Sequence, residues 1–106
     1  DSIDYAMLAN GGIGIISVTA NLLPNYKSKL VDSVFNKDFD TAKKINDDLY
    51  SINKALFVES NPIPIKAAMY LAGLIDTLEY RLPLTPPSRE TMNKLEDVLK
   101  GYEVIK

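Results

Sequence analysis

One short apolar segment, residues 13–18, constrains the fold of this chain more than any other feature of its sequence. The segment is Ile-Gly-Ile-Ile-Ser-Val, which is rich in β-branched residues and apolar on both faces. Such a run is typical of a strand buried inside a parallel sheet. A single strand leaves its backbone amides and carbonyls unpaired, so it needs a neighbouring strand on each side. We therefore expect those strands from another part of the same polypeptide or from another chain.

Helical patterns occupy most of the remaining sequence and predict five helices, at residues 2–9, 24–36, 40–58, 64–74 and 88–100. Gly11 and Gly12 are predicted to end the first helix, and Gly73 to end the fourth. The helix at 40–58 has apolar residues in steps of three and four, which is typical of packing against another helix: Ala42, Ile45, Leu49, Ile52 and Leu56. The predicted fold class is mostly α-helical with one short strand.

The charge pattern and the missing residue types narrow the functions open to this chain. A net charge of −2, with basic residues scattered among acidic ones, gives no electrostatic basis for binding nucleic acid or an anionic membrane. No apolar run approaches the roughly 20 residues of a membrane-spanning helix. The sequence has no cysteine and no histidine, which excludes disulfides, thiolate nucleophiles, imidazole catalysis and Cys/His zinc sites within it. We expect no cofactor and a cytoplasmic location.

Three motifs follow one another along the chain. Residues 11–21 are Gly-Gly-Ile-Gly-Ile-Ile-Ser-Val-Thr-Ala-Asn, residues 61–66 are Asn-Pro-Ile-Pro-Ile-Lys, and residues 81–87 are Arg-Leu-Pro-Leu-Thr-Pro-Pro. In this order and spacing they resemble the last barrel strand and the two proline-rich segments that follow it in the dihydrodipicolinate synthases. The wider class I aldolase superfamily, including N-acetylneuraminate lyase, shares that fold but usually lacks this proline pattern. The resemblance covers nearly the whole chain.

The resemblance implies that this chain is the C-terminal piece of a (β/α)8 TIM barrel followed by a three-helix extension. Residues 1–37 would be the last barrel units, namely helix seven, strand eight and helix eight. Residues 38–106 would form the C-terminal helical extension. The first seven barrel strands would then lie outside this chain, which agrees with the need of segment 13–18 for neighbours.

The resemblance also implies an activity. The family condenses pyruvate with aspartate semialdehyde through a Schiff base, at the entry to lysine and diaminopimelate biosynthesis, and is usually a homotetramer. Its Schiff-base lysine lies on the sixth barrel strand, and its proton-transferring tyrosines and threonine also lie elsewhere. We therefore expect no catalytic residue in this chain, and no activity from the chain alone.

Ile16 is the one substrate-binding residue that the resemblance indicates, because it matches the family isoleucine that borders bound pyruvate. The alternative is that Ile16 is simply a β-branched core residue, and both can hold together. Ser17 and Thr19 could face a barrel interior, but local hydrogen bonds are the favoured interpretation of both hydroxyls. Asn21 lies in the loop that follows and is a weaker candidate.

The charged residues favour structural interpretations. The lysines of the amphipathic helices are predicted to be solvated on exposed faces: Lys27, Lys29, Lys43, Lys44 and Lys54. Lys66 lies on a mostly apolar helix, where we expect a neighbouring carboxylate to offset its charge. Asp1 and Asp4 could suggest a metal pair, but acidic residues also favour a helix N-terminus, and no metal site is predicted.

Two other functions remain open from the sequence. The same barrel could act on a different 2-keto acid, because substrate choice rests on strands and loops outside this chain. Alternatively, the helix seam at residues 42–56 could belong to a small helical interaction module with no enzymatic role. The strand-like segment 13–18 argues against that module, which would not need it.

Overall fold

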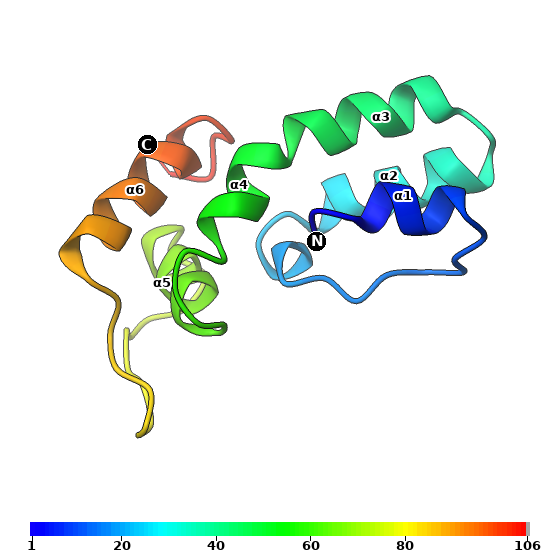
Figure 1. Ribbon diagram of the computed structural model, residues 1–106. Helices are drawn as coiled ribbons and strands as arrows, with labels where there is room; N and C mark the ends of the chain where they lie inside the picture. The colour runs from blue at the N-terminus through cyan, green and yellow to red at the C-terminus, as the bar shows by residue number, and fades with distance from the viewer. Residues whose placement is uncertain (106) are drawn as a thin grey trace. The chain divides into compact units, whose positions relative to one another are not determined.

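The computed structural model describes residues 1–105. They form six α-helices and one short 3-10 helix, shown in Figure 1: α1 Asp4–Ala9, η1 Thr19–Asn21, α2 Pro24–Phe35, α3 Phe39–Asp48, α4 Tyr50–Ala55, α5 Ile63–Leu71 and α6 Arg89–Lys100. The chain divides into two compact units, Asp1–Asn53 and the residues from Lys54 onward, with the boundary inside α4. Among these described helices, none combines the length and the apolar character needed to span a membrane.

The strand predicted at residues 13–18 is absent, and this part of the predicted fold class is wrong. Residues 12–17 have no regular secondary structure, and the described residues contain no strand at all. Figure 1 shows the segment as an extended stretch of chain between α1 and η1. A strand exists only through hydrogen bonds to a neighbouring strand, and residues 1–105 provide none. The sequence pattern therefore predicted a strand whose partners the described residues do not contain.

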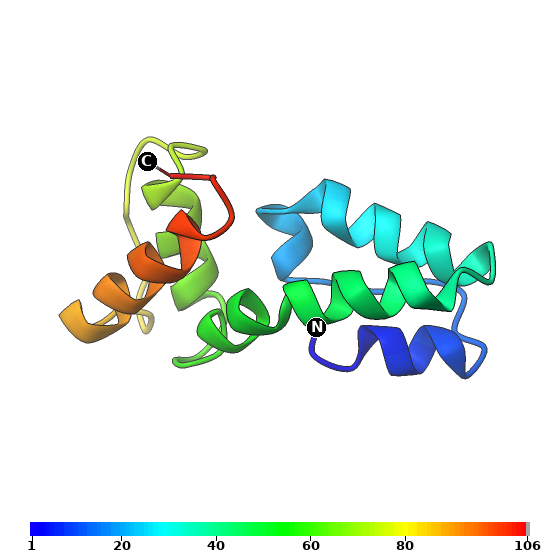
Figure 2. The same ribbon diagram turned by 90° about the horizontal axis from the view of Figure 1, so that it is seen from above.

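Unit 1 is built from three helices that all contact one another. α2 packs against both α3 and α1, and Figures 1 and 2 show α1, α2 and α3 lying side by side. Pro24 occupies the first turn of α2, where its missing amide has no cost, and the Asp38 side chain caps α3 by accepting a hydrogen bond from the Thr41 amide. Gly11, with φ of 98°, follows the end of α1, as predicted. The core of this unit is aliphatic: Leu8, Leu22, Leu23, Leu30, Val34, Ala42, Ile45, Leu49 and Ile52.

The helix predicted at residues 40–58 is two helices, α3 and α4, separated at Leu49. Leu49 has φ of −85° and ψ of −3°, a small departure from helical geometry that ends α3. Its amide still bonds to the Ile45 carbonyl, so the axis is interrupted only briefly. The predicted apolar seam is confirmed, since all five of its residues are buried: Ala42, Ile45, Leu49, Ile52 and Leu56.

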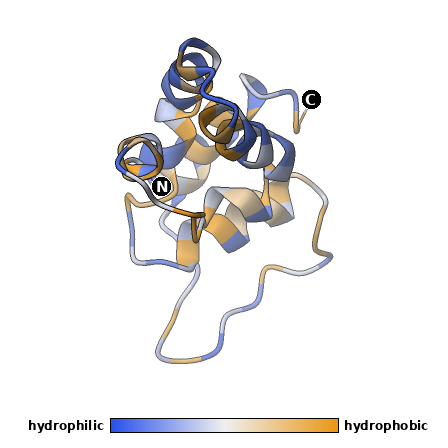
Figure 3. Ribbon diagram, turned by 90° about the vertical axis from the view of Figure 1, so that its right-hand side faces the viewer, coloured by the Kyte–Doolittle hydropathy of each residue, from blue (hydrophilic) through white to orange (hydrophobic). Residues whose placement is uncertain are grey.

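Unit 2 is built on the packing of α5 against α6. α5 is mostly apolar and buries residues on several sides: Ile63, Pro64, Ile65, Ala67 and Ala68. α6 is amphipathic, with Leu95 and Leu99 buried and charged residues outside. Figure 3 shows hydrophilic and hydrophobic residues following each other along the helices, as amphipathic packing requires. Ser88 caps α6 by accepting a hydrogen bond from the Thr91 amide, and Gly73, with φ of 72°, follows α5.

Candidate functional site

Ile16, the predicted substrate-binding residue, lies in the extended segment between α1 and η1 with its side chain entirely exposed. Its relative exposure is 101%, and that of Ile13 in the same segment is 94%. Within the described residues, no backbone hydrogen bond involves residues 13–17. Exposing two large aliphatic side chains on one short segment is unfavourable in water, so this surface is suited to being covered.

The C-terminal end of this segment is held by the carboxylate of Asp1. Asp1 Oδ2 accepts hydrogen bonds from the Val18 amide at 2.8 Å and from the Thr19 amide at 3.2 Å. Asp1 Oδ1 accepts a short hydrogen bond from the Ser17 hydroxyl. Ser17 Oγ in turn accepts from the Ala20 amide at 3.0 Å. The chain is therefore fixed within two residues of Ile16, although Ile16 itself is exposed.

The Asp1 carboxylate also belongs to a buried ionic cluster with Asp4 and Lys27, which we call the Lys27 cluster. Lys27 Nζ lies 3.0 Å from Asp1 Oδ1 and 2.8 Å from Asp4 Oδ2. The three side chains are almost fully shielded, with exposures of 3% for Lys27, 1% for Asp1 and 9% for Asp4. The Lys27 ammonium therefore lies between the two aspartate carboxylates.

The prediction that Lys27 is solvated on an exposed helix face is wrong. α2 packs against α1, and the side chain of Lys27 points into that contact, where the two aspartates meet it. The sequence carried a signal for this placement. Lys27 precedes Leu30 and Val34 by three and seven residues, so it continues the apolar stripe of α2. A lysine on a buried stripe requires a carboxylate partner, and Asp1 and Asp4 were available.

The two other polar candidates near the segment form hydrogen bonds within unit 1. Thr19 is fully buried, and its hydroxyl donates to Asn53 Oδ1 at 2.7 Å. Asn53 reaches this position from α4, and its burial was not expected from the sequence. Asn21 Nδ2 donates to the Val18 carbonyl at 3.1 Å and remains exposed. These side chains brace the turn after the segment.

A cleft of about 390 Å³ lies between the segment and α2. Its lining combines the segment, η1 and the first turns of α2: Gly14, Ile15, Ser17, Ala20, Pro24, Lys27, Ser28, Val31 and Asp32. Ile15 and Ser17 line this cleft and Ile16 does not, in keeping with the alternation of side chains along an extended chain. The segment therefore presents Ile15 and Ser17 toward α2 and leaves Ile16 free on the opposite side.

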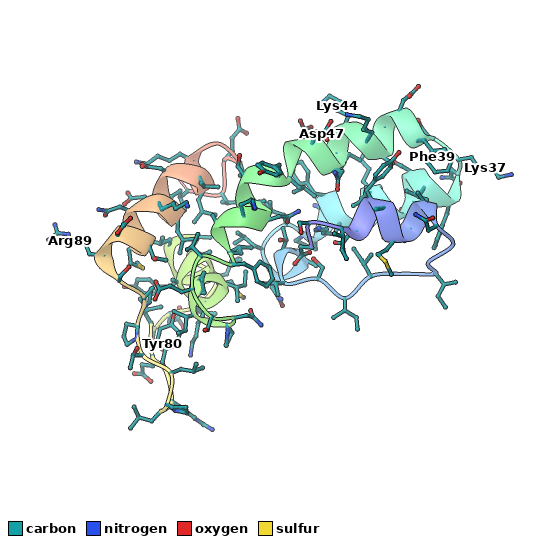
Figure 4. The ribbon with its side chains drawn as sticks, in the orientation of Figure 1. Lys37, Phe39, Lys44, Asp47, Tyr80 and Arg89 are labelled. Carbon is teal, nitrogen blue, oxygen red and sulfur yellow. The ribbon has the colours of Figure 1, made fainter. Side chains whose placement is uncertain are left out.

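Among residues 1–105 no carboxylate pairs with Lys66 of unit 2, so that prediction is wrong. Its ammonium donates a short hydrogen bond to the Glu79 carbonyl and lies 5.1 Å from the centre of the Tyr80 ring. The Tyr80 hydroxyl donates to the Ile63 carbonyl at 2.7 Å. Desolvation, and then the negative charge of Glu59, raise the pKa of Tyr80 above its usual range. These contacts tie the extended stretch at Tyr80, labelled in Figure 4, to the start of α5.

The remaining lysines of the predicted exposed set are exposed, as expected. Lys43 pairs with Asp47 at 2.5 Å and Lys44 with Asp48 at 2.8 Å, on the outer face of α3 where Figure 4 shows Lys44 and Asp47. Hydrogen bonds to these aspartates, together with their charge, raise the pKa of both lysines. Exposed pairs of this kind contribute little to stability. Within residues 1–105, no group of three or more acidic side chains is arranged to hold a metal ion.

Comparison with known proteins gives a consistent result. Residues 1–102 match the model of the dihydrodipicolinate synthetase family. The chain is 68% identical over 106 residues to the 4-hydroxy-tetrahydrodipicolinate synthase of Aliarcobacter butzleri, covering 100% of this chain and 36% of that protein. It is 59% identical over 104 residues to the enzyme of the same name from Campylobacter jejuni, covering 98% of this chain and 35% of that protein. The chain thus spans about a third of the length of these relatives.

Solved structures agree with the sequence relatives. The dihydrodipicolinate synthase of Aquifex aeolicus matches with a TM-score of 0.93 and 41% identity, over 97% of this chain and 35% of that one. The chloride-inhibited enzyme of Acinetobacter baumannii, solved in complex with pyruvate, matches with a TM-score of 0.92 and 38% identity, over 98% of this chain and 35% of that one. Residues 1–105 therefore share the fold of about a third of each of these synthases.

Proposed function

This chain belongs to the dihydrodipicolinate synthetase family, and on that premise we propose that it is the C-terminal part of a lyase that condenses pyruvate with aspartate semialdehyde. In this reaction a lysine amine attacks the ketone carbon of pyruvate and releases its oxygen as water, forming a Schiff base. That lysine lies outside the 106 residues, so the chain alone is inactive. The product enters lysine and diaminopimelate biosynthesis.

The observation that supports the proposal is the exposed position of the Ile16 side chain on an anchored segment. In a barrel, active sites lie at the C-terminal ends of the strands, and Ile16 lies close to the C-terminal end of the segment proposed as the eighth strand. Its side chain is wholly exposed while the backbone two residues later is hydrogen-bonded to a buried carboxylate. An apolar side chain held in this way is suited to line the pyruvate site and contact the methyl group of pyruvate.

The proposal extends to the organisation of the protein. Residues 1–37 supply the last barrel units, and residues 38–106 supply the C-terminal helical extension. The protein is cytoplasmic and assembles as a homotetramer, as the family resemblance implies. Among the similar solved structures, one is described as a monomeric dihydrodipicolinate synthase variant, with a TM-score of 0.93, so assembly is a property to be measured for each member.

The other functions open from the sequence receive less support. No feature of residues 1–105 favours another 2-keto acid over pyruvate, and the residues that discriminate substrates are proposed to lie on other strands. A freestanding helical interaction module has no use for a segment that exposes Ile13 and Ile16. Membership in the family therefore favours the aldolase-type lyase.

The contact of Ile16 with pyruvate can be tested in a protein of the relatives' full length that contains this sequence. Ile16→Ala removes apolar contact from the pyruvate site and should raise the KM for pyruvate by about tenfold. Ile13→Ala is the matched control, because Ile13 is nearly as exposed on the same segment but is not proposed to touch substrate. Equal effects of the two substitutions, or no effect of Ile16→Ala, would contradict the assignment.

A further inference from the structure

The Lys27 cluster is the only buried ionic group of unit 1 that the described residues contain, and one of its members bonds to the segment that carries Ile16. Asp1 is that member. Its Oδ1 contacts Lys27 and its Oδ2 accepts from the Val18 and Thr19 amides. Asp4 contacts Lys27 but has no bond to the segment. Asp4 also contacts the backbone of Asp1, but among the three side chains only that of Asp1 bonds to the end of the segment.

The buried charges of the Lys27 cluster are connected to the segment by the hydrogen bonds that the Asp1 carboxylate accepts. The two carboxylates surround the Lys27 ammonium, and the backbone ammonium of Asp1 lies 3.9 Å from Asp4 Oδ1, in a place where solvent reaches less than a tenth of any of the three side chains. Hydrogen-bond donors further stabilise a buried carboxylate. The donors present are the Ser17 hydroxyl and the amides of Val18 and Thr19, all at the end of the segment. The carboxylate that Lys27 contacts is therefore the same one that holds the end of the segment.

From this geometry we propose that Lys27 is a positioning residue for pyruvate, acting through the Asp1 carboxylate on the segment that presents Ile16. Lys27 does not touch the substrate: its ammonium is enclosed by the two aspartates, on the α2 side of the segment. It fixes the rotamer of Asp1, which fixes the backbone at residues 18 and 19. The inference rests on the proposed function, because it needs Ile16 to border the pyruvate site. Small displacements of a substrate-contacting group have large effects on binding and rate.

The test uses the full-length protein, with pyruvate as the probe. Lys27→Met keeps the length of the side chain and removes its charge, and it should raise the KM for pyruvate on the order of tenfold while leaving kcat at saturating pyruvate nearly unchanged. Asp4→Asn should have a smaller effect, because Lys27 and Asp1 remain paired. Lys27→Arg should recover most of the wild-type KM, since a guanidinium can also bridge two carboxylates. Lys43→Met, on the exposed face of α3, is the control and should change neither parameter.

The outcomes separate this proposal from the proposed function and from a merely structural role. Failure of the wild-type protein to form a pyruvate adduct with borohydride would contradict both the proposed function and the positioning role of Lys27. A wild-type adduct, together with a Lys27→Met protein that melts at lower temperature but keeps the wild-type KM, would overturn only the positioning role. If Lys27→Met does not fold, Ser17→Ala serves instead, because it removes one donor to Asp1 without touching the ionic pair. An unchanged KM in Ser17→Ala and in Asp1→Asn would then contradict the proposal.

Discussion

Asp1 combines an ion pair and three hydrogen bonds on one carboxylate, in a place with almost no access to solvent. Its side chain is 1% exposed, with Lys27 on one oxygen and the Val18 and Thr19 amides on the other. A buried ion pair of this kind adds little net stability relative to an apolar replacement, because desolvation offsets the attraction. Its effect is to select one arrangement of the groups around it. Here the selected arrangement is that of the chain next to Ile16.

Tyr80 allows a prediction at the residue scale for alkaline pH. Burial and the charge of Glu59 raise its pKa, so the folded protein holds this proton more tightly than the unfolded chain does. The protonated Tyr80 hydroxyl therefore contributes to the free energy of unfolding. This contribution is complete below the ordinary tyrosine pKa of about 10, and it is lost as pH rises through the pKa of Tyr80 in the folded protein. Wild-type protein should therefore lose more stability than Tyr80→Phe between about pH 9 and about pH 11.

Urea denaturation of both proteins across that range is the measurement. The difference between them is the informative quantity, because the other tyrosines and the lysines titrate in both. Tyr80→Phe also lacks the bond to the Ile63 carbonyl, so it starts less stable at neutral pH. Parallel curves for the two proteins over the alkaline range would contradict the raised pKa.

Individual residues were predictable from the sequence to the extent that a local pattern specified them. The helix-ending glycines Gly11 and Gly73 were predicted from residue type and position, and the assignment of Ile16 stays a prediction that rests on its motif. The burial of Lys27 was not predicted, because a lysine is usually solvated. Its position on the apolar stripe of α2, three residues before Leu30, places its side chain in the interior. Lys66 was given the wrong partner because its contacts, at Glu79 and Tyr80, come from a stretch with no periodicity.

At the scale of elements, the extended segment 12–17 differs from the helices around it. Helices satisfy their own backbone groups, so their existence and ends followed from periodicity, glycines and caps in the sequence. A strand is defined by its partners, and a pattern of β-branched residues shows only that partners are needed. For this reason the helices were predicted within a few residues, apart from the interruption at Leu49, while the strand was not found.

Hydrogen exchange tests the state of this segment directly. In the isolated chain, the amides of residues 13–17 should exchange rapidly, because the described residues offer them no acceptor. The amides of Val18 and Thr19 should exchange more slowly, since the Asp1 carboxylate accepts from both. Asp1→Asn should remove much of that protection. Slow exchange throughout 13–17 in the isolated chain would show that the segment finds partners within these 106 residues.

At the scale of the whole molecule, we propose that the chain contributes a wall and a framework rather than reactive groups. It spans about a third of relatives named 4-hydroxy-tetrahydrodipicolinate synthase, and the regular secondary structure of its described residues is entirely helical. Three motifs, at residues 11–21, 61–66 and 81–87, were enough to identify the family, whereas the active site was not predictable because its chemistry is proposed to lie on other strands. The proposal is therefore a claim about where the Schiff base forms.

Borohydride trapping with pyruvate, followed by peptide mass spectrometry, tests that claim most directly. It is applied to the full-length protein that contains this sequence and, in parallel, to the isolated 106-residue chain. The account predicts a reduced pyruvate adduct in the full-length protein, on a lysine outside these 106 residues, and no adduct in the isolated chain. A stable adduct on any lysine of this chain, or no adduct in the full-length protein, would contradict it.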